Sequence, residues 1–159
     1  MKTIKAIFAT MMVCLSMATV MTSCSDDDKD EPALPAAKSI EGTYTGDMTC
    51  SVMGSESVFE NLTYTVTAVS DATVRIAIPS FGNPPMQLPQ ITIEDIAVTG
   101  SDGKYQLAAK NFSGTTPEGK TYSGEIKGSS EAGILTVQFS LKYGAMPMAM
   151  ICSFTAPKK

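Results

Sequence analysis

The sequence contains no histidine and no tryptophan. Without histidine it cannot form a Ser-His-Asp or Cys-His catalytic arrangement, nor a zinc site with histidine ligands. Glu94 and Asp95 are the only adjacent acidic pair beyond residue 38, and neighbours on a strand point to opposite faces, so a carboxylate dyad is disfavoured. We therefore predict no enzyme, no catalytic residue, no metal site and no cofactor.

Positive charge is also scarce. Arg75 is the only arginine, and the formal net charge is −4, with 12 basic and 16 acidic residues. The lysines are scattered, whereas a nucleic-acid-binding surface needs clustered basic residues. The composition therefore argues against nucleic acid as a partner.

The first 23 residues have the layout of an export signal. Lys2 and Lys5 precede an uncharged run over 6–20, and small residues follow. A basic start, a short apolar core and small residues before a cleavage point are typical of a secretory signal peptide. A membrane-spanning helix is the alternative, but it needs about 20 apolar residues and the strongly apolar part is shorter. We predict a signal peptide over residues 1–23.

The end of this segment, Met21-Thr22-Ser23-Cys24, resembles the bacterial lipobox. In that motif an apolar residue and two small ones precede a cysteine. The resemblance implies that the Cys24 thiol carries a diacylglycerol and that the new amine is acylated, which makes a membrane the partner of the N-terminus. Several acyl chains together anchor a protein stably. Cleavage by ordinary signal peptidase, without a lipid, is the alternative.

Residues 24–38 are predicted to be a disordered tether. Five acids and one lysine fill 26–31, and prolines and alanines follow; such a segment cannot bury apolar surface. An acidic run after the lipidated cysteine resembles the surface-export signal of Bacteroidetes lipoproteins. The resemblance implies an outer-membrane location, with display on the cell surface as a further expectation. A merely solvated acidic spacer is the alternative.

Residues 39–159 are predicted to form one all-β domain. The apolar and polar residues alternate with a period of two, which is typical of half-buried strands, over 43–52, 58–70, 73–78, 90–98, 104–110, 121–127, 135–143 and 148–156. The phase changes at Glu94-Asp95, which predicts a β-bulge. Short turns favour an eight-stranded antiparallel up-and-down barrel, because closure removes the open edges. A two-sheet β-sandwich is the alternative.

This domain resembles the calycin-like (lipocalin-like) β-barrel domains of Bacteroidetes lipoproteins. The resemblance rests on Gly42-Thr43-Tyr44-Thr45-Gly46, on Met86-Gln87-Leu88-Pro89-Gln90-Ile91-Thr92-Ile93, and on the eight strands. It implies the barrel and carries no activity with it. The Gly-x-Trp signature of lipocalins is absent because the chain has no tryptophan. Ligand binding in the lipocalin sense is therefore an analogy at the level of the fold.

Two cysteines remain once Cys14 and Cys24 are assigned to the N-terminal segment. Cys50 and Cys152 both have the inward parity of their strands, the first and the last, which are neighbours if the barrel closes. Disulfides form in the periplasm and at the cell surface, so we predict a Cys50–Cys152 disulfide. Two buried free thiols acting as small hydrophobes are the alternative.

The predicted barrel interior offers a lining of tyrosine, methionine and phenylalanine that would suit an apolar ligand. Its members are Tyr44, Met48, Tyr64, Tyr122, Phe139, Tyr143, Met148, Met150 and Phe154. The same residues would equally well form a packed core. The proline-rich segment 79–89 is expected to be a lid over the mouth, a partner-binding loop or a covering connection.

Two functions follow from these expectations. One is an anchored envelope lipoprotein that binds a small apolar ligand. The other is a non-enzymatic surface lipoprotein with a filled barrel that contacts another envelope protein or a glycan. A cavity above about 300 Å³ with an open mouth would favour the first. A filled interior beside an exposed apolar loop patch would favour the second.

Overall fold

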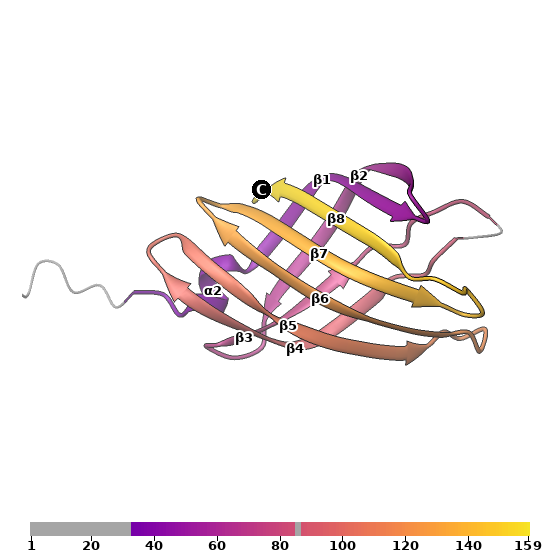
Figure 1. The fold of residues 1–159 in the computed structure, drawn as a ribbon. Helices are drawn as coiled ribbons and strands as arrows, with labels where there is room; N and C mark the ends of the chain where they lie inside the picture. Colours follow the sequence, from indigo (N-terminus) through magenta and orange to yellow (C-terminus); the bar gives the residue numbers. More distant parts are fainter. Residues whose placement is uncertain (1–32, 85–86) are drawn as a thin grey trace, which may run out of the picture. The chain divides into compact units, whose positions relative to one another are not determined.

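A computed structural model describes residues 33–84 and 87–159. The predicted signal peptide, Cys24, most of the predicted tether and Met86 lie outside the described residues. The described residues form one short helix and eight strands (Figure 1): α2 (Ala36–Ile40), β1 (Gly42–Val52), β2 (Ser55–Ala68), β3 (Thr73–Ile78), β4 (Ile91–Ser101), β5 (Lys104–Thr115), β6 (Thr121–Glu131), β7 (Ile134–Tyr143) and β8 (Met150–Pro157).

The strands form a closed barrel. Each strand pairs antiparallel with the next along the chain, and β1 pairs with β8. This confirms the predicted up-and-down barrel in place of the two-sheet sandwich. The alternation has the expected consequence: along β7 the odd-numbered residues Leu135 to Tyr143 are buried and point inside, while Gln138 and Lys142 are exposed.

Three β-bulges change which side chains point inside. The predicted bulge at Glu94-Asp95 is confirmed, because Ile76 pairs with Ile93 and Val74 with Ile96, so β4 carries one extra residue. Asp95 has a φ of 54°, a left-handed conformation in which aspartate is enriched. The bulge keeps Ile91, Ile93, Ile96 and Val98 on one face of β4, all of them buried.

A second bulge lies in β2 and was not predicted. Gly46 pairs with Leu62 but Met48 pairs with Phe59, so one extra residue sits in β2. The backbone N–H of Asn61, whose φ is 56°, donates to the Asp47 carboxylate at 3.0 Å. Simple alternation would put Val58 inside. The bulge instead turns Phe59 inward and leaves Val58 60 % exposed.

A third bulge, also not predicted, lies in β5 after Leu107. Leu107 pairs with Gly128 and Lys110 with Ile126, so three residues of β5 span two of β6. Ala109 is therefore exposed, whereas Phe112 is half-buried and packs against the core.

One end of the barrel, here called the helix end, is closed by α2. The helix contacts β2 and β4, and Figure 1 shows it at the end of the barrel where β4 turns into β5. Ala37 and Ile40 are fully buried there, and the Ile40 carbonyl accepts a hydrogen bond from the Tyr44 hydroxyl at 2.7 Å. The predicted disorder is therefore wrong for residues 36–38. These residues are ordered because the Ala37 side chain is buried in the core and the Ala37 N–H donates to the Asp71 carbonyl at 3.2 Å.

The opposite end, here called the loop end, is wider and carries the longer connections. β4 and β5 pair only over Val98–Ser101 and Lys104–Leu107, close to the helix end. β2 and β3 likewise share four residue pairs, all near the helix end. The strands therefore separate toward the loop end, where four connections lie together: 53–54, 79–90, 116–120 and 144–149.

Candidate functional site

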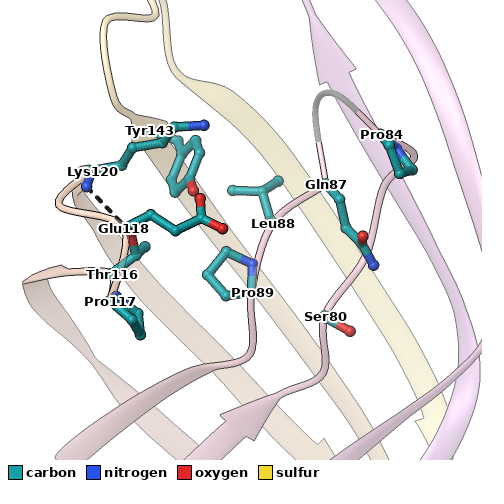
Figure 2. Close-up of a pocket in the computed structure, with 10 residues that line it drawn as sticks. All are labelled: Ser80, Pro84, Gln87, Leu88, Pro89, Thr116, Pro117, Glu118, Lys120 and Tyr143. Carbon is teal, nitrogen blue, oxygen red and sulfur yellow. Dashed lines mark hydrogen bonds between the residues drawn. The ribbon is translucent and has the colours of Figure 1, made fainter.

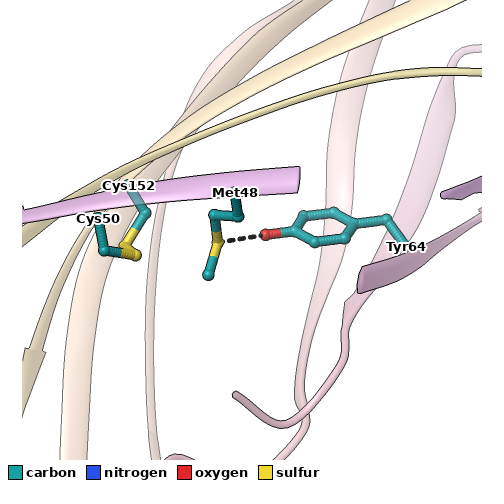
Figure 3. The surroundings of a disulfide bond; sticks show 4 residues. All are labelled: Met48, Cys50, Tyr64 and Cys152. Atoms are coloured by element: carbon teal, nitrogen blue, oxygen red, sulfur yellow. Dashed lines mark hydrogen bonds between the residues drawn. A yellow bond between two sulfur atoms is a disulfide. The ribbon is translucent and has the colours of Figure 1, made fainter. Parts of the chain in front are cut away.

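The middle of the barrel is packed with side chains. The rings of Tyr64 and Phe154 are stacked, with centroids 3.8 Å apart and planes 6° from parallel. The Tyr64 hydroxyl donates to the Met48 sulfur at 2.9 Å (Figure 3). All three residues are fully buried. Burial raises the pKa of Tyr64, and that of Tyr44 as well, so both phenols stay protonated and act as core residues.

A disulfide joins the first and last strands beside this core. Cys50 and Cys152 are direct partners in the β1–β8 ladder, with Cα atoms 4.1 Å apart, and their sulfurs are bonded (Figure 3). Both residues are buried. The predicted Cys50–Cys152 disulfide is confirmed, and it closes the barrel at the seam between the chain's two ends.

The loop end holds two neighbouring hollows. The first, the apolar recess, has a volume of about 380 Å³. Its most buried residues are Phe81, Leu88, Tyr143 and Met150, each between 4 and 9 % exposed. It is lined by Ser57, Val58, Phe59, Phe81, Gly82, Asn83, Leu88, Tyr143, Met146 and Met150.

The proline-rich connection between β3 and β4 forms one wall of this recess. Phe81 and Leu88 exchange two backbone hydrogen bonds, of 3.2 and 2.8 Å, and so fold the connection into a small hairpin. The Phe81 ring packs edge-on against Phe59, with centroids 5.4 Å apart. The described part of this segment therefore forms part of the loop end, and its two buried apolar side chains, Phe81 and Leu88, belong to the core of the barrel.

The second hollow, the polar recess, has a volume of about 360 Å³. Leu88 and Tyr143 line it as well, so these two residues separate the two recesses. The Lys120 ammonium lies 5.7 Å from the centre of the Tyr143 ring (Figure 2), within range of a cation–π interaction. The recess is lined by Ser80, Pro84, Gln87, Leu88, Pro89, Thr116, Pro117, Glu118, Lys120 and Tyr143.

The nine residues predicted to line a ligand-binding interior fall into four groups, the last of which is Met148 alone. Tyr143 and Met150 line the apolar recess. Tyr122 is half-buried and lies 6.5 Å from Phe112, ring centre to ring centre, outside both recesses. The others except Met148 are buried in the core and line neither recess: Tyr44, Met48, Tyr64, Phe139 and Phe154.

The prediction that Met148 points inside the barrel is wrong. Its side chain is 49 % exposed. The alternation was extended two residues too far, because β8 begins only at Met150 and Met148 belongs to the β7–β8 connection. Met146, from the same connection, lines the apolar recess instead.

Sequence reasoning missed most of the recess. Phe59 was missed because the bulge at Asn61 reverses the pattern before it. Phe81 and Leu88 stood out only as apolar residues among prolines. Residues in a connection, such as Phe81 and Leu88, follow no hydrophobic period. Their burial depends on contacts with residues that are distant in the sequence.

In 33–84 and 87–159, no three side chains of the metal-binding types come together. Nor does any helix in this part of the chain have the length and apolar character needed to cross a bilayer.

The closed ring of eight antiparallel strands, with two recesses at its loop end, is a small barrel of the calycin type. The chain belongs to the calycin-like beta-barrel domain family, whose pattern matches residues 40–156. It is similar in fold to a crystal structure of a "putative outer membrane protein" from Bacteroides fragilis, with a TM-score of 0.67 and 22 % sequence identity. The match covers 79 % of this chain and 53 % of that one, so the chain spans about half of that protein's length. No curated protein matches the chain.

Proposed function

We propose that the protein is a lipid-anchored envelope protein that binds a small apolar molecule in the apolar recess at the loop end. The observation that carries this proposal is the recess itself. Its volume of about 380 Å³ lies within the range of small-molecule pockets, roughly 300–1,000 Å³. Five of its lining residues are aromatic or methionine, namely Phe59, Phe81, Tyr143, Met146 and Met150.

The lining chemistry suits an adaptable apolar site. Methionine side chains are flexible and polarisable, and they fit irregular ligand shapes. Met150 lies at the floor, whereas Met146 is only half-buried and lies nearer the solvent. Polar side chains at this recess are few, and both Ser57 and Asn83 are exposed at its rim. The apolar part of a ligand would thus be buried against apolar side chains, while the polar groups of Ser57 and Asn83 stay in contact with water.

The proposed location rests on the N-terminal sequence. The lipobox-like residues ending at Cys24 and the acidic run after them support an anchor in the outer membrane, with the barrel held off the surface by the tether. The description of the B. fragilis protein of similar fold, a "putative outer membrane protein", agrees with this proposal.

A Ser57→Trp substitution is expected to block the apolar recess. Ser57 is exposed at the rim of the recess, so an indole there fills the hollow without disturbing the core. We expect the affinity for the fluorescent probe 1-anilinonaphthalene-8-sulfonate to fall by about tenfold or more, equivalent to about 1.4 kcal/mol. Fluorescence titration measures this change, and the thermal unfolding midpoint should stay unchanged.

Ser55→Trp is the matched control, because Ser55 is exposed on the same strand and the same face but does not line the recess. It should leave probe binding intact. Native mass spectrometry of the wild-type protein purified from its host should show a bound small molecule that Ser57→Trp lacks. A wild-type protein that neither binds the probe nor carries a molecule would refute the binding function.

The anchor has its own test. We expect Cys24→Ala to move the protein from the membrane fraction to the soluble fraction of host cells, because each buried CH₂ of an acyl chain contributes about 0.8 kcal/mol to membrane binding. Ser23→Ala, which keeps a small residue before the cysteine, is the control and should stay with the membrane. Cell fractionation with immunoblotting reads both variants. Membrane retention of Cys24→Ala after removal of the signal peptide, which the mass of the protein reports, would contradict the lipid anchor.

A second candidate function is docking to another envelope protein. The observation that favours it is a set of exposed apolar side chains toward the loop end: Met53, Val58, Met148 and Ile151, each between 49 and 76 % exposed. Exposed apolar patches of this kind mark interaction surfaces when they are contiguous. The Ser57→Trp comparison separates the two functions, since docking through these side chains needs no empty recess.

A further inference from the structure

The two recesses at the loop end differ in chemistry although they share a wall. Leu88 and Tyr143 line both of them. On one side lie Phe59, Phe81 and the two methionines of the apolar recess. On the other lie five polar or charged side chains of the polar recess: Ser80, Gln87, Thr116, Glu118 and Lys120. A single molecule that crosses the Leu88–Tyr143 wall would therefore meet an apolar surface at one end and a polar one at the other.

The charged side chains of the polar recess are mounted on a well-ordered turn between β5 and β6. The Thr116 N–H donates to the Lys120 carbonyl at 2.8 Å, and the Gly119 N–H donates to the Thr116 carbonyl at 2.9 Å. The Thr116 hydroxyl, on a residue only 7 % exposed, accepts from the Lys120 N–H at 3.2 Å. Three hydrogen bonds thus hold the backbone from which Glu118 and Lys120 project.

Glu118 and Lys120 do not neutralise each other. The ion pairs among the described residues are Lys38–Glu41, Arg75–Glu94 and Lys104–Glu131, and neither residue takes part in one. Figure 2 shows why: the Lys120 side chain runs over the Tyr143 ring, while Glu118 extends toward Leu88. Charged residues on turns are often simply solvated. Here, however, one carboxylate and one ammonium both face a hollow of about 360 Å³.

We propose that the ligand is an amphipathic molecule with a zwitterionic head group. Its apolar part occupies the apolar recess, and its head crosses the Leu88–Tyr143 wall into the polar recess. There Lys120 binds the anionic group of the head and Glu118 binds the cationic group. This inference rests on the proposed function, because it takes the apolar recess to be the site of the tail.

The charge balance favours a zwitterion over a singly charged head. An anionic head would gain Lys120 but would place its charge near the Glu118 carboxylate. A cationic head would gain Glu118 and meet the Lys120 ammonium. A head that carries both charges satisfies both residues, and Ser80 and Gln87 supply hydrogen-bonding groups that suit its other polar atoms.

The test compares three amphiphiles with the same twelve-carbon chain, each used below its micelle concentration: dodecylphosphocholine, dodecanoate and dodecyltrimethylammonium. Calorimetric titration of the wild-type protein should show the tightest binding for the zwitterion. Lys120→Met should weaken binding of the zwitterion and of dodecanoate by about fivefold, as expected for an exposed ion pair worth up to about 1 kcal/mol. Glu118→Gln should weaken binding of the zwitterion and of the trimethylammonium compound to a similar extent.

Lys142→Met and Glu60→Gln are matched controls, because both residues are exposed and line neither recess. They should change no affinity. If all three amphiphiles bind equally well to the wild-type protein and to both variants, the head-group assignment is wrong while the binding function stands. If none of the three binds the wild-type protein, the proposed function itself fails.

Discussion

Replacing Phe154 with alanine is expected to lower the free energy of unfolding by about 3–5 kcal/mol, the usual cost of truncating a buried phenylalanine. Phe154 is fully buried in β8, and its ring stacks on Tyr64 at 3.8 Å. The cavity would open in the middle of the barrel. Strand pairing on both sides, of Phe154 with Met48 and with Val137, limits how far the walls can collapse to fill it. Urea unfolding followed by circular dichroism measures the loss.

Phe112→Ala is the control for this substitution. Phe112 also faces the inside of the barrel, but it is half-buried on β5 and its nearest ring partner, Tyr122, lies 6.5 Å away. Its removal should cost less than half as much, because less apolar surface returns to water. Equal losses for the two variants would show that the Tyr64–Phe154 stack is not the centre of the core.

The same core shows why the barrel could be predicted from the sequence. In β7 every second residue is apolar without interruption, and in an antiparallel barrel that pattern fixes which face is buried. The disulfide followed from the same parity, because Cys50 and Cys152 are inward residues of the two strands that must meet when the barrel closes.

Prediction failed where the period of two is broken. The bulge at Glu94-Asp95 was visible because isoleucine and valine on both sides show the change of phase. The bulge at Asn61 was not, because it depends on a left-handed residue and on a hydrogen bond from the Asn61 N–H to the Asp47 carboxylate on the neighbouring strand. A contact of this kind arises only when two strands are already paired.

The candidate site was harder to predict than the fold for a related reason. Its walls come from β2, β7, β8 and the connections 79–90, 116–120 and 144–149, several of which lie far apart in the sequence. Connections have no hydrophobic period to read. The burial of Phe81 and Leu88 depends on the small hairpin that they form with each other and on contact with Phe59. Tyr143 and Met150 were predicted because they are the last and first inward residues of their strands.

Removing the Cys50–Cys152 disulfide is expected to lower the free energy of unfolding by about 2–4 kcal/mol. The bond spans 102 residues, and in the chain-entropy model a loop of about 100 residues restricts the unfolded chain by up to about 4.7 kcal/mol. The native ladder of β1 with β8 is short, with five pairs from Asp47–Thr155 to Ser51–Ile151. The β6–β7 ladder is longer. Because the β1–β8 seam has fewer backbone pairs, we expect its stability to depend more on the cross-link.

Two comparisons separate the contribution of the disulfide bond to stability from the contribution of the packing of its two sulfur atoms. Reducing the wild-type protein removes only the bond, whereas the Cys50→Ala/Cys152→Ala variant removes the bond and two buried sulfurs. Guanidinium unfolding should place the reduced wild type between the oxidised wild type and the variant, and a reductant should leave the variant unchanged. If reduction of the wild type has no effect on stability, the β1–β8 ladder and the Tyr64–Phe154 core hold the seam closed without the bond.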